Sequence, residues 1–254
     1  MKKVSVLGAG TMGNGIAQTY AANGHNVTLV DMSHEGLDRG LAAIRKSLDR
    51  FVKKEKITQE QSDEIMARVA GSTDLPTAVA DVDMVVEAVF EREDVKKDVF
   101  VQLDKHAPQG AILATNTSSI SITAIASATS RPESVVGMHF MNPVPLMKLV
   151  ELIKGEKTSD EVVSRTKEIA EGLGKTVGVA EDYAGFISNR VLMPMINEAA
   201  FTLYEGVATR DDIDTIMKLG MNHPMGPLAL ADFIGIDVCV NILDYMRDQF
   251  GDPK

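Results

Sequence analysis

The sequence predicts an α/β fold in which a doubly wound, mostly parallel sheet is followed by an all-helical domain. Three features lead to this prediction. Short apolar segments alternate with longer helical patterns, a glycine-rich turn follows the first apolar segment, and the final part of the chain has helical periodicity without strand patterns. With 254 residues, the chain is long enough for one large domain or two modest ones with buried cores.

Six apolar segments in the first two-thirds of the chain are predicted to be strands. They are rich in Val, Ile and Leu and do not alternate with polar residues, which is typical of strands covered on both faces. Helical patterns lie between them, including residues 13–23, 34–54 and 160–173, so we expect parallel strands connected by helices. The predicted strands are Val4–Leu7, Val27–Val30, Met84–Val89, Ile112–Ala114, Val135–Phe140 and Leu149–Ile153.

The pattern then changes, and from Phe186 onward we find helical periodicity and no convincing strand. We place the domain boundary at Asp182–Gly185, which gives a sheet domain of residues 1–184 and a helical domain of residues 185–254. Pro194 falls inside the first helix of the helical domain. It should kink or locally break this helix, because proline has no backbone N–H and clashes with the preceding turn.

Composition and charge argue against several classes of protein. The formal net charge of −10 argues against general binding to nucleic acid or anionic membranes, since both carry the same sign. No segment approaches the roughly 18 apolar residues that span a bilayer, and the N-terminal apolar run is too short for a signal peptide. Cys239 is the single cysteine, which rules out an intrachain disulfide and a cysteine metal cluster. We therefore expect a soluble, cytoplasmic protein with no metal in its site.

A glycine-rich turn between the first strand and the first helix predicts a dinucleotide site. The first glycine permits a tight turn, the second lets a pyrophosphate approach the backbone, and the third allows the helix to pack closely on the strand. The helix N-terminus would then face the phosphates. This motif is typical of the Rossmann-type fold, and its residues are Gly8, Ala9, Gly10, Thr11, Met12 and Gly13.

Asp31 adds a second element to this site. It ends the second predicted strand, 18 residues after Gly13, where an acidic residue binds the adenosine ribose hydroxyls of a dinucleotide. A carboxylate there repels a 2′-phosphate, and no arginine follows it directly, so NAD is favoured over NADP. The glycine motif alone is also compatible with FAD, although we find no second FAD-binding element. The other alternative is a purely structural turn beside an incidental acidic residue.

His139 is the histidine that the predicted topology places best for acid–base chemistry. It lies at the C-terminal end of a predicted central strand, where ligands bind in open parallel sheets, and imidazole titrates near neutrality. The next strand carries Glu151, and a turn at residues 142–145 would bring this carboxylate against the imidazole. Such a carboxylate would fix the ring tautomer and stabilise the imidazolium. The alternative is a structural histidine and a glutamate that faces solvent.

Three segments carry a resemblance to a known family: residues 139–151, which read His-Phe-Met-Asn-Pro-Val-Pro-Leu-Met-Lys-Leu-Val-Glu, residues 114–119 and residues 185–190. They resemble the signature of the 3-hydroxyacyl-CoA dehydrogenases, most narrowly the bacterial 3-hydroxybutyryl-CoA dehydrogenases, and the resemblance extends from residue 2 to the end. It implies NAD-dependent interconversion of (S)-3-hydroxyacyl-CoA and 3-oxoacyl-CoA, with 3-hydroxybutyryl-CoA and acetoacetyl-CoA as the expected substrates. Family members continue with a short C-terminal segment, so we expect the helical domain to be truncated in this sequence.

The resemblance also implies residue roles that spacing alone does not supply. His139 would be the catalytic acid and base, with Glu151 as its carboxylate partner. Ser118 and Asn189 match positions that contact the substrate, orient it and support the reacting centre. Further NAD-contacting positions are matched by Glu91, Lys96, Asn116, Ser118 and Asn142.

Without the resemblance, four of these residues would be interpreted differently. Glu91 and Lys96 would be solvated helix charges. Ser118 would be a loop or cap hydroxyl, and Asn189 would be an amide on a helix surface or a C-cap-like amide.

A basic segment stands out in this acidic chain. Between residues 39 and 56 it carries seven Lys or Arg residues against two acidic ones, and several of them share one helical face. Coenzyme A ends in a nucleotide with several phosphates, which such a helix would attract. The resemblance assigns CoA contacts to Ser47 and Lys54, and the alternative is a solvated helix surface. The basic residues are Arg39, Arg45, Lys46, Arg50, Lys53, Lys54 and Lys56.

The helical domain carries more apolar residues than a small appendage would need, so we expect it to form a homodimer or a higher homo-oligomer and to close the substrate cleft. Two other functions stay open at this point. One is a hydroxy-acid or sugar-acid dehydrogenase that acts without CoA, and the other is a non-enzymatic NAD-binding protein with the same fold. The apolar residues include Val191, Leu192, Met195, Ile196, Phe201 and Leu203.

Overall fold

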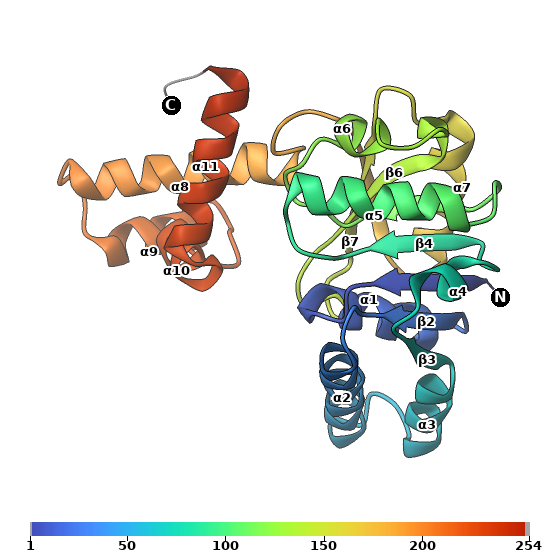
Figure 1. Ribbon diagram of the computed structural model, residues 1–254. Coiled ribbons are helices and arrows are strands. Elements are labelled where there is room, and N and C mark those ends of the chain that lie inside the picture. The colour runs from blue at the N-terminus through green and yellow to red at the C-terminus, as the bar shows by residue number, and fades with distance from the viewer. Residues whose placement is uncertain (1, 252–254) are drawn as a thin grey trace. The chain divides into compact units, whose positions relative to one another are not determined.

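The computed structural model describes residues 2–251, which divide into two compact units (Figure 1). The first, here called the sheet unit, extends to Asp182, and the second, the helical unit, begins at Tyr183. This division falls within the Asp182–Gly185 segment, where the sequence pattern changes from strands to helices. Along the described chain, no helix is long and apolar enough to cross a membrane.

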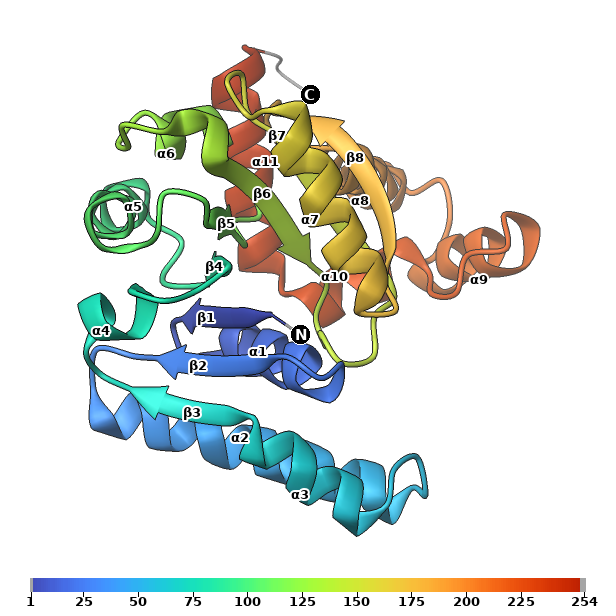
Figure 2. The ribbon, with the colours of Figure 1, turned by 90° about the vertical axis from the view of Figure 1, so that its right-hand side faces the viewer.

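The sheet unit is built on one eight-stranded sheet, which confirms the predicted α/β fold class (Figure 2). Its strands are β1 (Lys3–Leu7), β2 (Asn26–Val30), β3 (Val69–Ser72), β4 (Met84–Glu87), β5 (Ile112–Thr115), β6 (Val135–Phe140), β7 (Leu149–Lys154) and β8 (Thr176–Glu181). The spatial order is β3-β2-β1-β4-β5-β6-β7-β8, and only β6 and β7 are antiparallel neighbours. The strand order therefore changes direction between β1 and β4, the position at which doubly wound sheets bind ligands.

Helices cover both faces of this sheet. One face is covered by α1 (Thr11–Ala22), α2 (His34–Lys53), α3 (Gln59–Ala67) and α7 (Asp160–Gly172), whose buried side chains share a core with the strands. The other face is covered by α4 (Leu75–Val79), α5 (Glu93–His106) and α6 (Ile122–Ala126). Figure 2 shows α5 and α6 on one side of the sheet and α1 and α7 on the other.

Side chains alternate between the two faces, and this alternation decides which residues reach the candidate site. Val86, Ala114 and Met138 belong to the core beneath α1 and α7. Their neighbours in sequence, Glu87, Thr115 and His139, therefore point to the face of α5 and α6. Polar side chains from three successive strands thus gather on one face, at the C-terminal ends of β4, β5 and β6.

The sequence patterns do not predict two of the strands, β3 and β8. Both lie at the edges of the sheet, and most of their residues are partly exposed. Each also contains a glycine, so neither shows the continuous apolar run by which the six buried strands are predicted. An edge strand of this kind is defined by its partner's backbone rather than by its own side chains.

The helical unit contains α8 (Ser188–Tyr204), α9 (Arg210–Gly220), α10 (Pro227–Ile234) and α11 (Ile236–Phe250). Its core is small and consists of Met193, Ile196, Ala231, Cys239 and Met246. The helix α8 continues through Pro194, so the helix is not broken there, and a kink at this residue stays a prediction. Met193 and Ile196 flank the proline and anchor the helix in the core, and this burial outweighs one lost backbone hydrogen bond.

Candidate active site

The glycine-rich turn after β1 has a backbone that only glycine allows at two of its positions. Gly8 has a φ of +92°, and a Cβ there would lie 2.5 Å from the carbonyl oxygen of Ala88. A Cβ at Gly13 would lie 1.7 Å from the carbonyl oxygen of Gly8. At Gly10, by contrast, a Cβ would meet no protein atom within 4 Å. Gly8 and Gly13 thus serve close packing, whereas Gly10 leaves its backbone open to a ligand.

The N-terminus of α1 is suited to an anion. The helix begins at Thr11, directly after the turn, and its N-cap residue Gly10 provides no side-chain cap. The first turn of the helix also contains no acidic residue. The first backbone N–H groups therefore keep the partial positive charge of the helix end, which attracts phosphate. This cradle fits the pyrophosphate of a dinucleotide.

Asp31 lies beside this cradle, directly after β2. Its Oδ2 accepts a hydrogen bond from the backbone N–H of Ala9 at 3.0 Å, and its Oδ1 accepts one from that of Ser33 at 3.2 Å. Gly36 on α2 leaves room for this carboxylate, because a Cβ there would lie 2.4 Å from Oδ1. The carboxylate is thus held at the edge of the glycine turn, where a ribose would follow the pyrophosphate.

His139 and Glu151 form a buried pair near the C-terminal end of β6. They are direct partners in the antiparallel register of β6 and β7, and Nδ1 of the imidazole lies 3.1 Å from Oε2 of the carboxylate. His139 is 8% exposed and Glu151 is 3% exposed. The contact that the sequence predicts is therefore present, and the alternative of a glutamate that faces solvent is wrong.

Asn116 and Asn142 lie on either side of this strand end. Asn116 follows β5, and its Oδ1 accepts a hydrogen bond from the backbone N–H of Phe140 at 2.8 Å, which ties the ends of β5 and β6 together. Asn142 is exposed in the loop after β6 and precedes a cis peptide bond to Pro143. The two amides therefore differ in their surroundings: one is buried in the sheet edge, and the other is open to a ligand.

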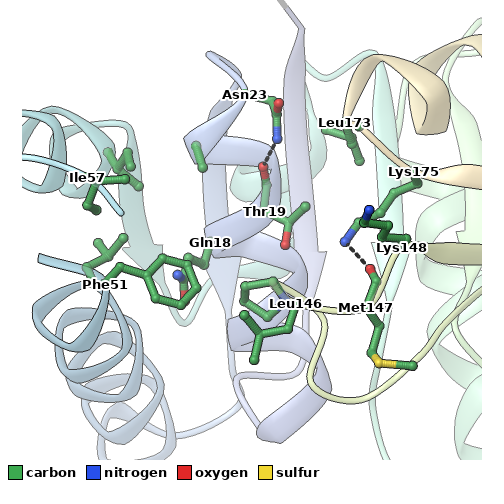
Figure 3. Close-up of a pocket in the computed structure, with 15 residues that line it drawn as sticks. Gln18, Thr19, Asn23, Phe51, Ile57, Leu146, Met147, Lys148, Leu173 and Lys175 are labelled. Carbon is green, nitrogen blue, oxygen red and sulfur yellow. Dashed lines mark hydrogen bonds between the residues drawn. The ribbon is translucent and has the colours of Figure 1, made fainter. Parts of the chain in front are cut away.

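The same loop is held from its other side by Lys175. Its Nζ donates hydrogen bonds to the carbonyl oxygens of Val144 at 2.6 Å and Met147 at 2.7 Å, and burial lowers the pKa of this lysine. Figure 3 shows the second of these bonds at the edge of a cavity of about 320 Å³, lined by α1, α2 and residues 145–148 and 173–175. This cavity lies on the face of the sheet opposite to His139, so it is not the place of proton transfer.

Glu91 lies in the loop between β4 and α5 and organises the loop that contains Ser118. Its Oε1 accepts hydrogen bonds from the hydroxyl of Thr117 at 2.5 Å and from the backbone N–H groups of Ser118 at 2.9 Å and Ser119 at 3.2 Å. Burial by itself would raise the pKa of Glu91, but the charge of Lys96 and the hydrogen bonds from this loop outweigh it and lower the pKa. Glu91 therefore stays ionised at neutral pH.

The interpretation of Lys96 as a solvated helix charge is wrong, whereas Glu91 is an exposed residue of the loop before α5. Lys96 is 1% exposed, and its Nζ lies 2.7 Å from Oε1 of Glu87 and 3.3 Å from Oε2 of Glu91. Glu87 is fully buried at the same edge of the sheet, and the sequence patterns do not single it out. A signal was available, because Glu87 is an acidic residue at the end of an otherwise apolar strand, at the edge where ligands bind.

The basic segment forms the second half of α2 and its C-terminal end. Ser47 is half-buried on this helix, and Lys54 is its exposed C-cap residue. Two of the seven basic residues are paired with carboxylates, Arg39 with Glu35 and Arg45 with Asp63. Within residues 2–251, no ion pair involves Lys46, Arg50, Lys53, Lys54 or Lys56, so this end of the helix carries uncompensated positive charge.

Asn189 lies in the first turn of α8, in the helical unit. It is 9% exposed, so the interpretation of this amide as part of a helix surface is wrong. The backbone enters the helix through Gly185 and Phe186, which both have positive φ values of 76° and 50°. Asn189 is therefore a buried amide beside a sharply turned segment, which is unusual for a residue with a merely solvating role.

The fold and the glycine cradle define the class of protein, an NAD-binding oxidoreductase with a helical C-terminal domain. The model of the 3-hydroxyacyl-CoA dehydrogenase NAD binding domain matches residues 3–183, and that of the C-terminal domain of the same family matches residues 185–254. The chain belongs to the 3-hydroxyacyl-CoA dehydrogenase family. This confirms the resemblance that the sequence carries, and NAD as the cofactor.

Full-length relatives agree with this assignment. A protein of Deinococcus radiodurans named probable 3-hydroxybutyryl-CoA dehydrogenase is 52% identical over 99% of this chain and 90% of its own length. The 3-hydroxybutyryl-CoA dehydrogenase of Bradyrhizobium diazoefficiens is 49% identical over 100% of this chain and 86% of its own length. The crystal structure of (S)-3-hydroxybutyryl-CoA dehydrogenase from Ralstonia eutropha is similar with a TM-score of 0.96 and 47% identity, and covers 99% of this chain and 88% of that one.

Proposed function

We propose that this dehydrogenase interconverts (S)-3-hydroxybutyryl-CoA and acetoacetyl-CoA, with His139 as the acid and base and Glu151 as the carboxylate that orients it. The observation that carries this proposal is the buried contact of 3.1 Å between the two side chains at the ligand-binding edge of the sheet. The names of the full-length relatives support the choice of a four-carbon acyl group.

The geometry of the pair determines which nitrogen moves the proton. Because Nδ1 faces Glu151, its proton is shared with the carboxylate, and Nε2 is the nitrogen that exchanges a proton with the substrate hydroxyl. When NAD is bound, it supplies the acceptor for the hydride that leaves C3. As the hydroxyl proton moves to Nε2, the imidazole becomes positively charged, and the buried carboxylate of Glu151 stabilises this charge.

The other predicted residues are assigned to binding. Gly10 and the N-terminus of α1 would hold the pyrophosphate, and Asp31 the adenosine ribose. Ser118 would contact both NAD and the acyl group, from a loop whose backbone is fixed by Glu91. Asn189 would support the substrate. Contacts of Glu91, Lys96, Asn116 and Asn142 with NAD complete the proposed set.

The basic end of α2 supports an acyl-CoA rather than a free hydroxy acid as the substrate. Its uncompensated charge suits the nucleotide phosphates of coenzyme A, with Ser47 and Lys54 as the proposed contacts. A free hydroxy acid carries no nucleotide phosphates, so this positive charge would have no group of the substrate to bind. Turnover of free acetoacetate, but not of acetoacetyl-CoA, would instead favour that alternative.

Exposed apolar side chains on the helical unit support the proposal of a homodimer. Val191 and Phe201 on α8, Leu219 on α9 and Phe233 on α10 are each at least half exposed, whereas Ile196 is buried in the core of the unit. Large apolar side chains exposed in this number mark an association surface. Light scattering at micromolar concentration should give the mass of two chains, and a monomer would contradict the proposal.

The experiment that tests the acid–base role is the substitution His139→Gln. Acetoacetyl-CoA reduction, followed by the absorbance of NADH, should slow by about 10²- to 10⁴-fold, because the proton donor is lost. The affinity for NADH should stay within about threefold of that of the wild type. His106→Gln, at the end of α5, is the matched control and should leave turnover unchanged. Near-normal turnover of His139→Gln would refute the assignment.

A further inference from the structure

A second buried charge pair lies behind the candidate site and takes no part in the proposed proton transfer. Glu87, the last residue of β4, and Lys96 on α5 are 0% and 1% exposed, with Oε1 and Nζ 2.7 Å apart. The same Oε1 accepts a hydrogen bond from the backbone N–H of Val89 at 2.7 Å, and Oε2 accepts one from the hydroxyl of Thr115 at 2.7 Å. The carboxylate is thus completely enclosed by three donors.

The ammonium of Lys96 connects this carboxylate to the loop that contains Ser118. Its Nζ lies 3.3 Å from Oε2 of Glu91, and Oε1 of Glu91 holds the backbone N–H of Ser118 at 2.9 Å. A continuous set of polar contacts therefore runs from the interior of the sheet, through one lysine, to the surface of the site. Glu91, with 39% of its side chain exposed, is more exposed than Lys96 and Glu87.

A need for stability alone does not explain the buried pair. The cost of removing two charges from water offsets most of their attraction, and apolar side chains of the same volume would stabilise the fold as well or better. The charges instead fix the position of Lys96, because a carboxylate lies on either side of its ammonium. One cation shared by two carboxylates also leaves net negative charge on the exposed one, Glu91.

We propose that Glu87 is a positioning residue of the dehydrogenase site. It fixes the ammonium of Lys96, which fixes Glu91 and, through it, the loop that presents Ser118. Glu87 is completely buried and does not touch the substrate or NAD, so it acts only through Lys96. The inference rests on the proposed roles of Ser118 and Glu91 in binding.

The first test is the substitution Glu87→Gln, which keeps the shape of the side chain and removes its charge. We expect kcat/KM for acetoacetyl-CoA to fall by about 10- to 100-fold, since a displacement of about 1 Å in a positioning group has effects of this size. Thr115→Val removes the hydroxyl that holds Oε2 and leaves the charge, so it tests the same contact if Glu87→Gln does not fold. Its kcat/KM should fall by about 3- to 10-fold, a smaller loss in the same direction.

The matched control is Asp104→Asn, which breaks the ion pair between Asp104 and Arg131 at the far end of α5. This variant should lower Tm without lowering kcat/KM. If Glu87 has a merely structural role, Glu87→Gln will behave in the same way as this control.

A double-mutant cycle with Ser118→Ala distinguishes positioning from a general loss of structure. Because Glu87 acts through the loop of Ser118, adding Glu87→Gln to the Ser118→Ala variant should lower kcat/KM by about threefold or less. Adding it to the Ser47→Ala variant, which changes a residue on α2, should lower kcat/KM as much as it does in the wild type. The cycle is measured twice, in kcat/KM and in the Kd of NADH from nicotinamide fluorescence. Additive effects in both measurements would overturn the proposal.

The proposed function is tested separately by the turnover of acetoacetyl-CoA by the wild type. If that turnover is absent, the proposed function fails. The double-mutant cycle measured by the Kd of NADH still decides whether Glu87 positions the loop.

Discussion

Substitution of Glu151 by glutamine would remove one charge from the pair with His139 and leave the volume of the side chain unchanged. Glu151 is buried, and its carboxylate contacts the imidazole at 3.1 Å. The amide could still bond to the ring, so the geometry of the hairpin should persist. What is lost is the stabilisation of the positive charge that forms on the imidazole when it accepts the hydroxyl proton.

The magnitude follows from the distance. Two unit charges 3.1 Å apart interact by about 5 kcal/mol at an effective dielectric constant of about 20. The charge of an imidazolium is spread over two nitrogens, and that of a carboxylate over two oxygens, so we take about half of this value. A loss of about 2 to 3 kcal/mol in the transition state corresponds to a rate reduction of about 100-fold.

The assay is the oxidation of (S)-3-hydroxybutyryl-CoA with NAD, followed by the formation of NADH. Glu151→Gln should lower kcat by about 100-fold and leave the Kd of NADH unchanged. The matched control is Asp160→Asn on α7, which breaks the ion pair with Lys154 at the end of the same strand and should leave kcat unchanged. A kcat for Glu151→Gln within threefold of the wild type would refute the electrostatic argument.

Three further predictions concern the cofactor site. Gly13→Ala places a Cβ 1.7 Å from a backbone oxygen and should lower the free energy of unfolding in urea by about 3 kcal/mol. Gly10→Ala should lower it by about 1 kcal/mol or less and weaken NADH binding about tenfold or more. A larger loss of stability for Gly10→Ala than for Gly13→Ala would contradict the geometry. Asp31→Arg should raise the Kd of NADH, and an unchanged Kd would overturn the ribose contact. The pKa of Glu91 lies below its usual 4.5, so its stabilising effect is complete above about pH 4.5 and is lost as the pH falls towards the lower pKa of the folded state. The Tm of the wild type should therefore decrease more steeply below pH 4.5 than that of Glu91→Gln, and parallel curves would exclude this effect.

The part of the site that sequence predicts well is local in the chain. His139 and Glu151 are 12 residues apart, on neighbouring strands joined by a proline-rich turn, so their contact follows from one hairpin. The glycine turn and Asp31 follow in the same way from one strand–helix–strand unit. In such segments a short connection brings the two elements side by side, so only a few side-chain contacts are possible. The residue types then indicate which of these contacts forms.

The buried Glu87–Lys96 pair could not be predicted in this way. Its contacts depend on the register of β4 and β5, which pairs Glu87 with Thr115, and on the face that α5 turns to the sheet. Neither the register nor the orientation of the helix can be derived from residues 87–96 themselves. From the sequence, the charged residues of this segment therefore have the pattern of a solvated helix start. The burial of Asn189 is likewise a tertiary property that the pattern of its own segment does not indicate. The edge strands β3 and β8 are likewise defined by their neighbours.

The hairpin formed by β6 and β7 has a consequence for how this enzyme can diversify. Both members of the acid–base pair lie within 13 consecutive residues, and the ladder between the two strands sets their separation. The groups proposed to hold coenzyme A lie on a different helix, more than 80 residues earlier in the chain. Mutations that alter the affinity for coenzyme A can therefore accumulate on that helix without disturbing the chemical step, so that the binding of the thioester and its reactivity are free to evolve separately.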